Sequence, residues 1–427
     1  MKIFMEIPDH VQFIVKKLTD AGFVAYLAGG CVRDLILGLK PKDYDVATTA
    51  TPEQIMQLFK RTVSVGAQFG VVKVLLNHES YEVATFRGKN AEEDVLRRDF
   101  TINGLLYDLR EQRVIDYVGG LKDIQMKLIR AIGDPQDRFE EDKLRMIRSV
   151  RLAARYRYQI EEKTFCAVQK LAYKIKEVSP ERIRDELVKI LTEGNAAMGI
   201  QLLQDSGLLV HILPEVSRMK GVPQPPEFHP EGDVWTHTLK MLENLQNPTP
   251  ELAMGVLLHD VGKPVTFKIK DRIRFHGHAE VGAKLALEIC QRLKFSNKEK
   301  DTIFQLVRDH LKFLNVKNMR PSTLKRFLRG EHFQDLLELH RLDSISSKRS
   351  LENWEFCKDQ LALLGKEALN PPPLLRGEDL IAMGYVPGPI FREILNFVEE
   401  AQLEGRISTR EEALELVKQT YPREEKA

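Results

Sequence analysis

The chain has few cysteines, and their spacing argues against two common ways of stabilising a fold. There are four in 427 residues, and no two of them form a CxxC pair. They are Cys31, Cys166, Cys290 and Cys357. A disulfide scaffold and a thiolate zinc site are therefore not expected, and a reducing compartment is favoured.

Long apolar runs and an excess of one charge are also missing. No run approaches the roughly 20 residues of a membrane-spanning helix, and the start of the chain has acids and a proline where a signal peptide needs apolar residues. Lys and Arg number 64 against 62 Asp and Glu, so any nucleic-acid binding depends on local patches. With 43% hydrophobic residues the chain can bury a sizeable core. We expect a cytoplasmic protein with no membrane partner.

Strand signals are confined to the first third of the chain. We expect strands at 24–27, 43–48, 71–76, 81–86 and 113–118, with a hairpin turn at 77–80. From about residue 127 helical periodicity dominates, and breaks rich in Pro and Gly follow later. The expected fold class is α+β, with a small mixed sheet at the N-terminus. We divide the chain into a head (1–125), a helical neck (126–218), a helical domain (219–365) and a helical tail (366–427).

The first motif joins an expected strand to an expected helix through two glycines. In LAGGCVRDLILG (27–38), Gly29 and Gly30 let the backbone approach a ligand closely. The helix that follows offers free N–H groups suited to phosphate, and Arg33 on its first turn can add a charged hydrogen bond. A glycine pair alone is most often a structural turn, so this motif indicates phosphate binding only together with the next one.

Three acidic residues follow on expected strands. Asp43 and Asp45 are two apart, so their carboxylates share one face of a strand, and Glu82 alternates with apolar residues in YEVATF (81–86). Carboxylates grouped in this way repel one another unless a cation lies between them, and Mg²⁺ is bound by such oxygen ligands together with substrate phosphates. If the two strands are neighbours, Glu82 completes a three-carboxylate cluster.

These residues belong to an ordered series of motifs. GGCVRD and DYD are followed by RRDFTING (97–104), EEDKLRMIRSVRLAARY (140–156) and SPERIRDEL (179–187). The series resembles the bacterial and eukaryotic class of tRNA nucleotidyltransferases, which includes CCA-adding enzymes and their poly(A) polymerase relatives. The resemblance implies a polymerase-β-type nucleotidyltransferase head and an all-α neck. It also implies transfer of nucleotides from CTP, and in full CCA-adding members from ATP, to the 3′ end of tRNA.

The resemblance assigns roles to individual residues. It implies that Asp43, Asp45 and Glu82 are catalytic, with the two aspartates as Mg²⁺ ligands. It implies that Asp142 and Arg145 pair with the Watson–Crick edge of the incoming base, and the donor and acceptor pattern of these side chains suits that role. We place both on one face of a single helix, continued by Arg148, Arg151 and Arg155, where phosphate contact competes with a solvated basic face. The expected nucleotide-binding residues are Gly29, Gly30, Arg33, Arg98, Asp99, Asn103, Asp142, Arg145, Arg148 and Arg151.

One segment departs from the pattern of enzymes that add the full CCA triplet. Those relatives carry a flexible segment between the Glu82 strand and the RRDFTIN motif, whereas only Gly88–Leu96 occupies that place here. The short segment favours an enzyme that adds CC and stops. Full CCA addition is the next interpretation, and poly(A) synthesis is a third.

Histidines mark a second site. Nine of the eleven lie between His211 and His340. Their order with two aspartates resembles the HD phosphohydrolase superfamily, which implies an all-α domain that binds a divalent transition metal or Mg²⁺. We prefer His278 to His276 as a ligand, and expect His229, His332 and His340 to be ordinary core or surface residues. The expected metal ligands are His237, His259, Asp260, His278, His310 and Asp343.

Lys263, just after the HD pair, could meet a substrate phosphate, and the family implies a phosphatase or 2′,3′-cyclic phosphodiesterase acting on RNA ends. A hydrolase with a nucleotide-sensing head, or a non-catalytic RNA-binding protein, are competing interpretations. The expected partners are the tRNA 3′ end and CTP, with ATP for the full triplet. No stable protein partner is implied. In the tail, Arg376, Lys418 and Arg423 are available for RNA phosphates.

Overall fold

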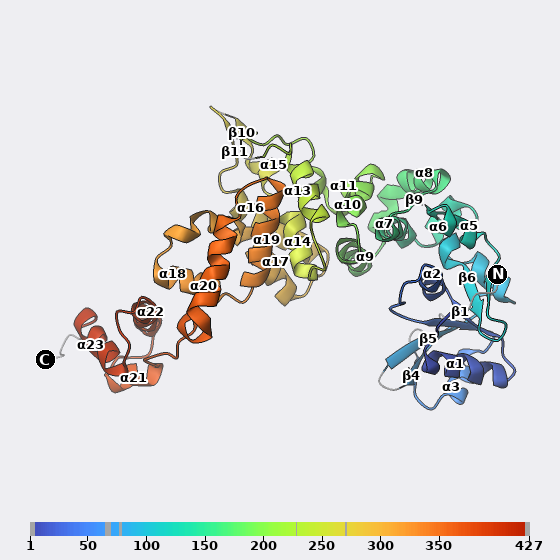
Figure 1. Cartoon of the computed structure of the whole chain (residues 1–427), viewed down its shortest axis with the longest axis horizontal. Coiled ribbons are helices and arrows are strands. Elements are labelled where there is room, and N and C mark those ends of the chain that lie inside the picture. The colour runs from blue at the N-terminus through green and yellow to red at the C-terminus, as the bar shows by residue number, and fades with distance from the viewer. Residues whose placement is uncertain (1–4, 65–69, 77–78, 228, 270, 423–427) are drawn as a thin grey trace. The chain divides into compact units, whose positions relative to one another are not determined.

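The computed structural model describes residues 5–64, 70–76, 79–227, 229–269 and 271–422 (Figure 1). Two compact units, 1–217 and 218–427, make up the chain. The finer division into four segments stays a prediction. Asn77 and His78 of the expected hairpin turn, and Arg423 of the tail, lie outside the described residues.

A seven-stranded mixed sheet forms the centre of the first unit, with the order β3-β4-β5-β2-β1-β6-β7. β2 and β5 pair in parallel, and the other neighbours are antiparallel. The strands are β1 (Ala25–Ala28), β2 (Asp45–Thr48), β3 (Thr62–Ser64), β4 (Val71–Leu76), β5 (Glu79–Thr85), β6 (Leu105–Asp108) and β7 (Arg113–Asp116). The helices of this part are α1 (Asp9–Asp20), α2 (Gly30–Ile36), α3 (Pro52–Leu58), α4 (Ala91–Leu96) and α5 (Gly120–Gln125).

Apolar and charged side chains alternate along β4 and β5, and this alternation determines which face of the sheet is buried. Val72, Val74 and Val83 are fully buried, whereas Lys73 and Glu82 point to the opposite face, where they line a cavity. Burying one apolar row fixes the register, because a one-residue slip would turn these valines to the cavity and the charged residues into the core. The sheet thereby presents its polar row to a single site.

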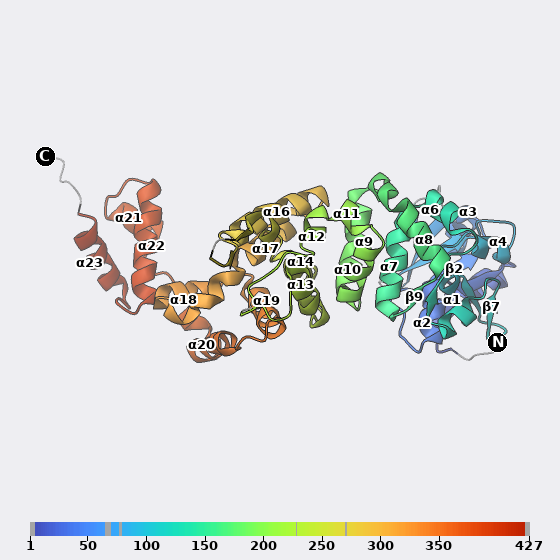
Figure 2. The ribbon, with the colours of Figure 1, turned by 90° about the horizontal axis from the view of Figure 1, so that it is seen from above.

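Helices make up most of the rest of the first unit (Figure 2). They are α6 (Pro135–Glu141), α7 (Leu144–Tyr156), α8 (Glu162–Leu171), α9 (Pro180–Thr192), α10 (Ala196–Asp205), α11 (Leu209–Ile212) and α12 (Pro214–Ser217), with 3₁₀ turns at Thr101–Asn103 and Ala172–Glu177. α7 packs against α9 and α10. Its apolar residues, among them Met146, Val150 and Ala153, are buried.

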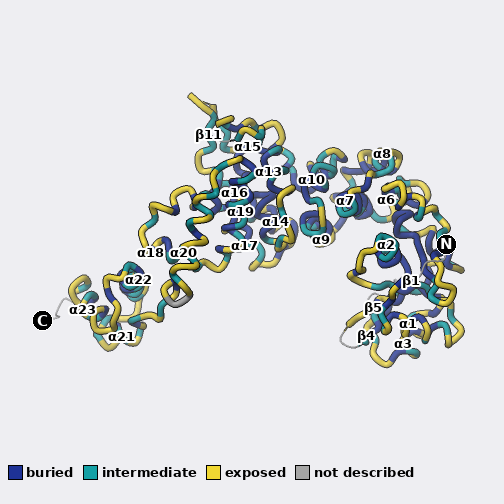
Figure 3. Tube along the Cα trace, viewed as in Figure 1, coloured by how far each residue is buried: buried dark blue, intermediate teal, exposed yellow. Residues whose placement is uncertain are grey.

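The second unit is helical. Its helices are α13 (Val234–Glu243), α14 (Pro250–Leu258), α15 (Lys263–Thr266), α16 (His278–Arg292), α17 (Asn297–Asp309), α18 (Pro321–Leu328), α19 (Phe333–Ser346), α20 (Glu352–Leu369), α21 (Gly377–Ala382), α22 (Pro389–Leu403) and α23 (Arg410–Thr420), with a 3₁₀ segment at His310–Asn318. Buried positions gather in α13, α14, α17 and α19 (Figure 3), and α14 contacts the other three. None of the helices described is long and apolar enough to cross a membrane.

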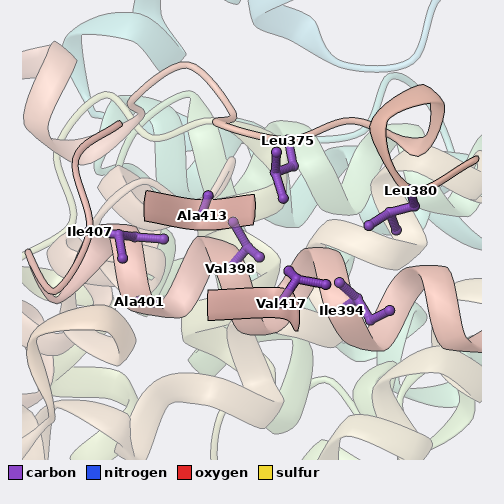
Figure 4. Close-up of a cluster of buried hydrophobic side chains, with 8 residues drawn as sticks. All are labelled: Leu375, Leu380, Ile394, Val398, Ala401, Ile407, Ala413 and Val417. Atoms are coloured by element: carbon purple, nitrogen blue, oxygen red, sulfur yellow. The ribbon is translucent and has the colours of Figure 1, made fainter. Parts of the chain in front are cut away.

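The last three helices enclose a small apolar core of their own (Figure 4). It contains Leu375, Leu380, Ile394, Val398, Ala401, Ile407, Ala413 and Val417. This core is tied to α18, because Arg326 and Arg329 both donate to the carboxylate of Glu399 on α22. Burial and charge together fix the tail within the second unit.

The expected fold class is confirmed, with local differences. β3 and β6 were not expected: β3 has only three residues, and Leu105, Leu106 and Tyr107 of β6 are all buried and show no alternation. Two short pairs, β8 (Leu128–Ile129) with β9 (Gln159–Ile160) and β10 (Lys268–Ile269) with β11 (Ile273–Arg274), add strand to segments expected to be helical. Two-residue strands give too little pattern to be seen in a sequence.

Candidate active sites

The polar face of the sheet forms the floor of a cavity of about 730 Å³ in the first unit. Asp45 at the start of β2 lies opposite Glu82 of β5 in the parallel register. Asp43 lies two residues before Asp45, ahead of the strand, and all three acids line the cavity. The structure therefore places the three expected acids on one cavity, with Asp45 beside Glu82.

The surroundings of Asp45 disfavour its ionised form. Burial is the largest cause and the negative charge of Glu82 the next, and together they raise the pKa of Asp45 to about 6, although Arg98 acts against them. A divalent cation between these oxygen atoms would remove that repulsion, and hard oxygen donors of this kind suit Mg²⁺. The donor set fits the expected metal.

Gly29 shows why glycine is required beside these acids. Its φ is 77°, and a Cβ there would lie 3.0 Å from Nη1 of Arg98. Arg98 also donates to Asp94 at 2.9 Å. Arg33 is buried, donates to Asp34 and Asn103, and lies over the ring of Tyr156 at 4.5 Å. Arg33 lines the cavity, and its guanidinium already contacts Asp34, Asn103 and Tyr156.

Asp99 organises the RRDFTIN segment. Its carboxylate accepts hydrogen bonds from Asn103 Nδ2 at 3.0 Å and from the amide of Phe100 at 2.8 Å, and it pairs with Arg148 at 2.9 Å. Burial acts to raise the pKa of Asp99, but Arg148 and Asn103 hold it below its ordinary value. An ionised Asp99 thus fixes one wall of the cavity, which Asn103 and Arg148 also line.

The base-reading pair is built differently from the sequence expectation. Asp142 and Arg145 do not share one helix, because α6 ends at Glu141 and Asp142 has extended backbone angles (φ −147°, ψ 103°). The Asp142 carboxylate accepts from the amide of Leu144 at 3.2 Å, which satisfies a free N–H at the start of α7. Both side chains still line the cavity. Arg182 donates to Asp142 at 2.9 Å, and sequence reasoning missed this contact although Arg182 lies within SPERIRDEL.

The arginines on α7 pair with acids of the chain. Arg151 donates to Glu186 at 2.6 Å, and Arg155 pairs with Asp34 and Glu193 at 3.5 and 3.4 Å. Arg148 and Arg151 line the cavity, and Arg155 is not among its lining residues. Arg155 is half-buried and pairs with acids of the chain, and its contact with phosphate stays a prediction.

A second site occupies the helical unit. Its six expected ligands fall into two groups: His237, His259 and Asp343 form one, and Asp260, His278 and His310 form the other. Within each group the ligand atoms lie within 4.8 Å of one another. His276 belongs to neither group, although it lines the same cavity of about 680 Å³.

Backbone carbonyl groups orient three of these imidazoles. Nδ1 of His259, His278 and His310 faces the backbone carbonyls of Val256, Phe275 and Val307 at 2.8, 2.9 and 2.6 Å. The Nε2 atom of His237 faces the Asp343 carboxylate at 3.2 Å, and the Nε2 atoms of His259 and His278 face the Asp260 carboxylate at 3.0 and 3.5 Å. Imidazoles oriented through one nitrogen, with the other directed at neighbouring carboxylates, are typical of metal ligands. This donor set fits one or two divalent ions.

His237 is held by a carboxylate instead of a carbonyl. Glu231 accepts from Nδ1 of His237 at 2.7 Å and faces Nδ1 of His229 at 2.8 Å. Burial alone lowers the pKa of His237, but the hydrogen bonds to Asp343 and Glu231 raise it to about 9. Sequence reasoning missed Glu231 and treated His229 as an ordinary residue, because both lie in the Pro- and Gly-rich segment before α13.

Cations surround the second site. Lys263 is buried and lies 2.7 Å from Asp260 and 2.6 Å from the side-chain oxygen of Gln224. Arg349 pairs with Asp343 at 2.5 Å. Burial acts to raise the pKa of Asp260, but His259 and Lys263 hold it well below its ordinary value. The site combines the expected metal ligands with two cationic side chains.

A mixed sheet carrying three acids on one cavity, followed by a helical unit with histidine and aspartate ligands, defines a class: a nucleotidyltransferase with an appended HD domain. Family comparisons agree. The poly A polymerase head domain matches residues 25–130, the probable RNA- and SrmB-binding site of polymerase A matches 157–220, and the HD domain matches 233–342.

Relatives identify the family. The CCA-adding enzyme of Ligilactobacillus salivarius is 30% identical over 96% of this chain and 97% of its own length. The poly(A) polymerase I of Salmonella typhi is 38% identical, but the alignment covers 50% of this chain and 51% of that protein, so the chain spans about half of that relative. The chain belongs to the family of CCA-adding enzymes and poly(A) polymerases.

Solved structures show the same fold. The Bacillus stearothermophilus CCA-adding enzyme in complex with CTP has a TM-score of 0.75 at 24% identity, covering 97% of this chain and 98% of that one. The Thermotoga maritima CCA-adding enzyme complexed with tRNA has a TM-score of 0.61 at 20% identity, covering 96% and 95%.

Proposed function

We propose that the chain is a cytoplasmic enzyme that adds two CMP residues to the 3′ end of tRNA, without a nucleic-acid template, and then stops. The supporting observation for transfer is the cluster of Asp43, Asp45 and Glu82 on the cavity floor. In the reaction the RNA 3′-oxygen attacks the α-phosphorus of CTP, the α–β phosphoanhydride bond breaks, and pyrophosphate leaves. Mg²⁺ bound by these acids would supply positive charge to the attacking oxygen and the leaving group.

Protein groups select the incoming base in this proposal. Asp142 accepts from the cytosine amino group, and Arg145 donates to the ring nitrogen and carbonyl. Arg145 is held for this purpose by Glu141 at 2.9 Å and by the carbonyls of Arg138 and Arg97 at 3.0 and 3.2 Å. An arginine with fixed partners keeps one orientation, which specificity requires.

The stop after two additions is supported by the segment between β5 and the RRDFTIN motif. Here Asn90 caps α4 by accepting from the amide of Glu93 at 2.9 Å, and Asp94 accepts from the amide of Arg87 at 3.0 Å. Asp94 also binds Arg98, which lines the cavity. A segment this short and this closely bonded has little freedom to rearrange when the substrate changes from CTP to ATP.

Full CCA addition is the second candidate, favoured by the relative that aligns over nearly the whole chain. Two RNA substrates separate the candidates: a tRNA transcript ending at the discriminator base, and one already ending in CC. With CTP the first should grow by two nucleotides. With ATP the second should not grow if the proposal is right, should gain one adenylate in a CCA-adding enzyme, and should grow into a long ladder in a poly(A) polymerase.

We propose that the helical unit is a metal-dependent phosphatase or 2′,3′-cyclic phosphodiesterase that leaves a 3′-hydroxyl at the end of the RNA. Its support is the six-ligand set with Lys263 and Arg349 beside it. A divalent ion there would polarise the phosphate ester and activate water, while Lys263 and Arg349 bind the phosphate oxygens. Hydrolysis of RNA ending in a 2′,3′-cyclic phosphate, measured after Mn²⁺, Ni²⁺ or Mg²⁺ addition, tests it, with Asp260→Asn as the inactive control.

A further inference from the structure

One row of residues crosses four strands of the cavity floor. Lys73 of β4 lies opposite Glu82 of β5, Glu82 lies opposite Asp45 of β2, and Asp45 lies opposite Ala28 of β1. Gly29 follows Ala28 directly, and all of these residues line the cavity. The carboxylates therefore lie in the middle of the row, with a glycine turn at one end and a lysine at the other.

The two ends of the row differ in chemistry. At the glycine end a Cβ on Gly29 would lie 3.0 Å from Arg98 Nη1 and 4.0 Å from an Asp45 carboxylate oxygen, so backbone, guanidinium and carboxylate converge there. At the other end Nζ of Lys73 lies 3.3 Å from Glu82. Each end thus offers a cation next to the acids.

In-line geometry assigns the ends to different substrates. The attacking and leaving oxygens lie on opposite sides of the phosphorus. This step rests on the proposed function: if the triphosphate lies at the Gly29 end with Arg98, the attacking RNA terminus must enter from the Glu82 end. We propose that Lys73 binds the phosphodiester group of the RNA's 3′-terminal nucleotide and thereby adds affinity for the RNA end beside the carboxylates.

The surroundings of Lys73 suit such a contact. Its side chain is 34% exposed, while its neighbours Val72 and Val74 are fully buried and fix the strand on which it stands. Ser80, on the same face of β5 as Glu82, also lines this end of the cavity and can add a hydroxyl donor. A lysine that instead protonated the departing pyrophosphate would have to lie at the Gly29 end of the row.

Steady-state kinetics of Lys73→Ala test the proposal. The KM for tRNA lacking its CCA end should rise about tenfold, while the KM for CTP and the kcat at saturating RNA stay within about twofold of wild type. Lys73→Arg should restore RNA binding. The matched control is Lys60→Ala, an exposed lysine of the same unit that is not among the cavity-lining residues.

Salt dependence gives a second readout that a purely structural role would not move. For Lys73→Ala, the slope of log Kd for RNA against log salt should fall by about 0.7, the value for one lost contact with a single strand. An unchanged RNA KM and slope, or a selective rise in the KM for CTP, would overturn the proposal for Lys73. If the wild-type protein adds no nucleotide, it is the proposed transferase function that fails instead.

Discussion

Replacing Asp45 by Asn should stabilise the metal-free protein while it abolishes nucleotide addition. Burial and the charge of Glu82 raise the pKa of Asp45 from an ordinary value of 3.8 to about 6. Above pH 7 the native state therefore holds an ionised carboxylate that it disfavours relative to the unfolded chain. The rise corresponds to at most roughly 3 kcal/mol, which the neutral and nearly isosteric amide would recover.

The pH dependence follows from the sign of the shift. Because the pKa is raised on folding, the native state binds more protons than the unfolded state between about pH 4 and 6, and wild-type stability falls as the pH rises through this window. The advantage of Asp45→Asn should be full at pH 8 and should shrink as the pH is lowered through 6. At pH 8 the melting temperature of the first unit should rise by about 5 °C or more, measured by calorimetry without divalent ions.

Two controls isolate the cause. Asp20→Asn removes an exposed acid that lies 3.7 Å from Arg110, and it should leave the melting temperature nearly unchanged. Saturating Mg²⁺ should stabilise the wild type and not Asp45→Asn, because only the wild type binds the ion fully. If Asp45→Asn destabilises the metal-free protein at pH 8, or if its gain does not depend on pH, the carboxylate cluster is not under the electrostatic strain inferred here.

Three further predictions concern the second site and the base reader. Asp260→Asn should lower the divalent metal retained after desalting by at least about tenfold, as measured by elemental analysis. The same variant should leave CMP addition intact. Loss of CMP addition together with phosphate-ester hydrolysis would contradict two independent sites. Glu231→Gln should weaken metal binding about 10- to 100-fold, because the Glu231 carboxylate no longer holds His237 in position. Titration with Mn²⁺ measures the affinity, and an unchanged affinity would contradict this role of Glu231. Arg182→Ala should lower the preference for CTP over UTP about two- to fivefold by freeing Asp142, and unaltered kcat/KM ratios would show that this ion pair does not position the reader.

Much of the first site could be predicted because its residues sit in a continuous pattern. The alternation around Glu82 and the two-residue spacing of Asp43 and Asp45 are properties of single strands. What the sequence could not show is strand order: the parallel pairing of β2 with β5 sets Asp45 beside Glu82 and leaves Lys73 at the end of the row. Partners far apart in the chain, such as Arg182 with Asp142, were missed for the same reason.

Helical periodicity misled where a side chain ends a helix. Residues 140–157 have the spacing of one helix, but the Asp142 carboxylate accepts the Leu144 amide and α7 starts anew. In the second site the expected ligands follow the order of the HD motif along the chain. Glu231 lies in an irregular segment before α13, where no helical or strand periodicity singles it out. On α7, Arg151 pairs with the buried Glu186 and Arg155 with the half-buried Glu193, and the sequence pattern of α7 alone could not reveal these partners on a distant segment.

The length and composition of the RNA product test the proposed addition of CC most directly. A tRNA transcript ending at the discriminator base is incubated with the full chain, Mg²⁺, CTP and ATP together, and the product is analysed by intact-mass spectrometry. We expect a gain of two cytidylates and no adenylate, and we expect Asp43→Ala and Asp45→Ala to abolish this gain. Addition of a terminal adenylate would contradict the stop after CC, and an unchanged RNA would contradict nucleotidyl transfer itself.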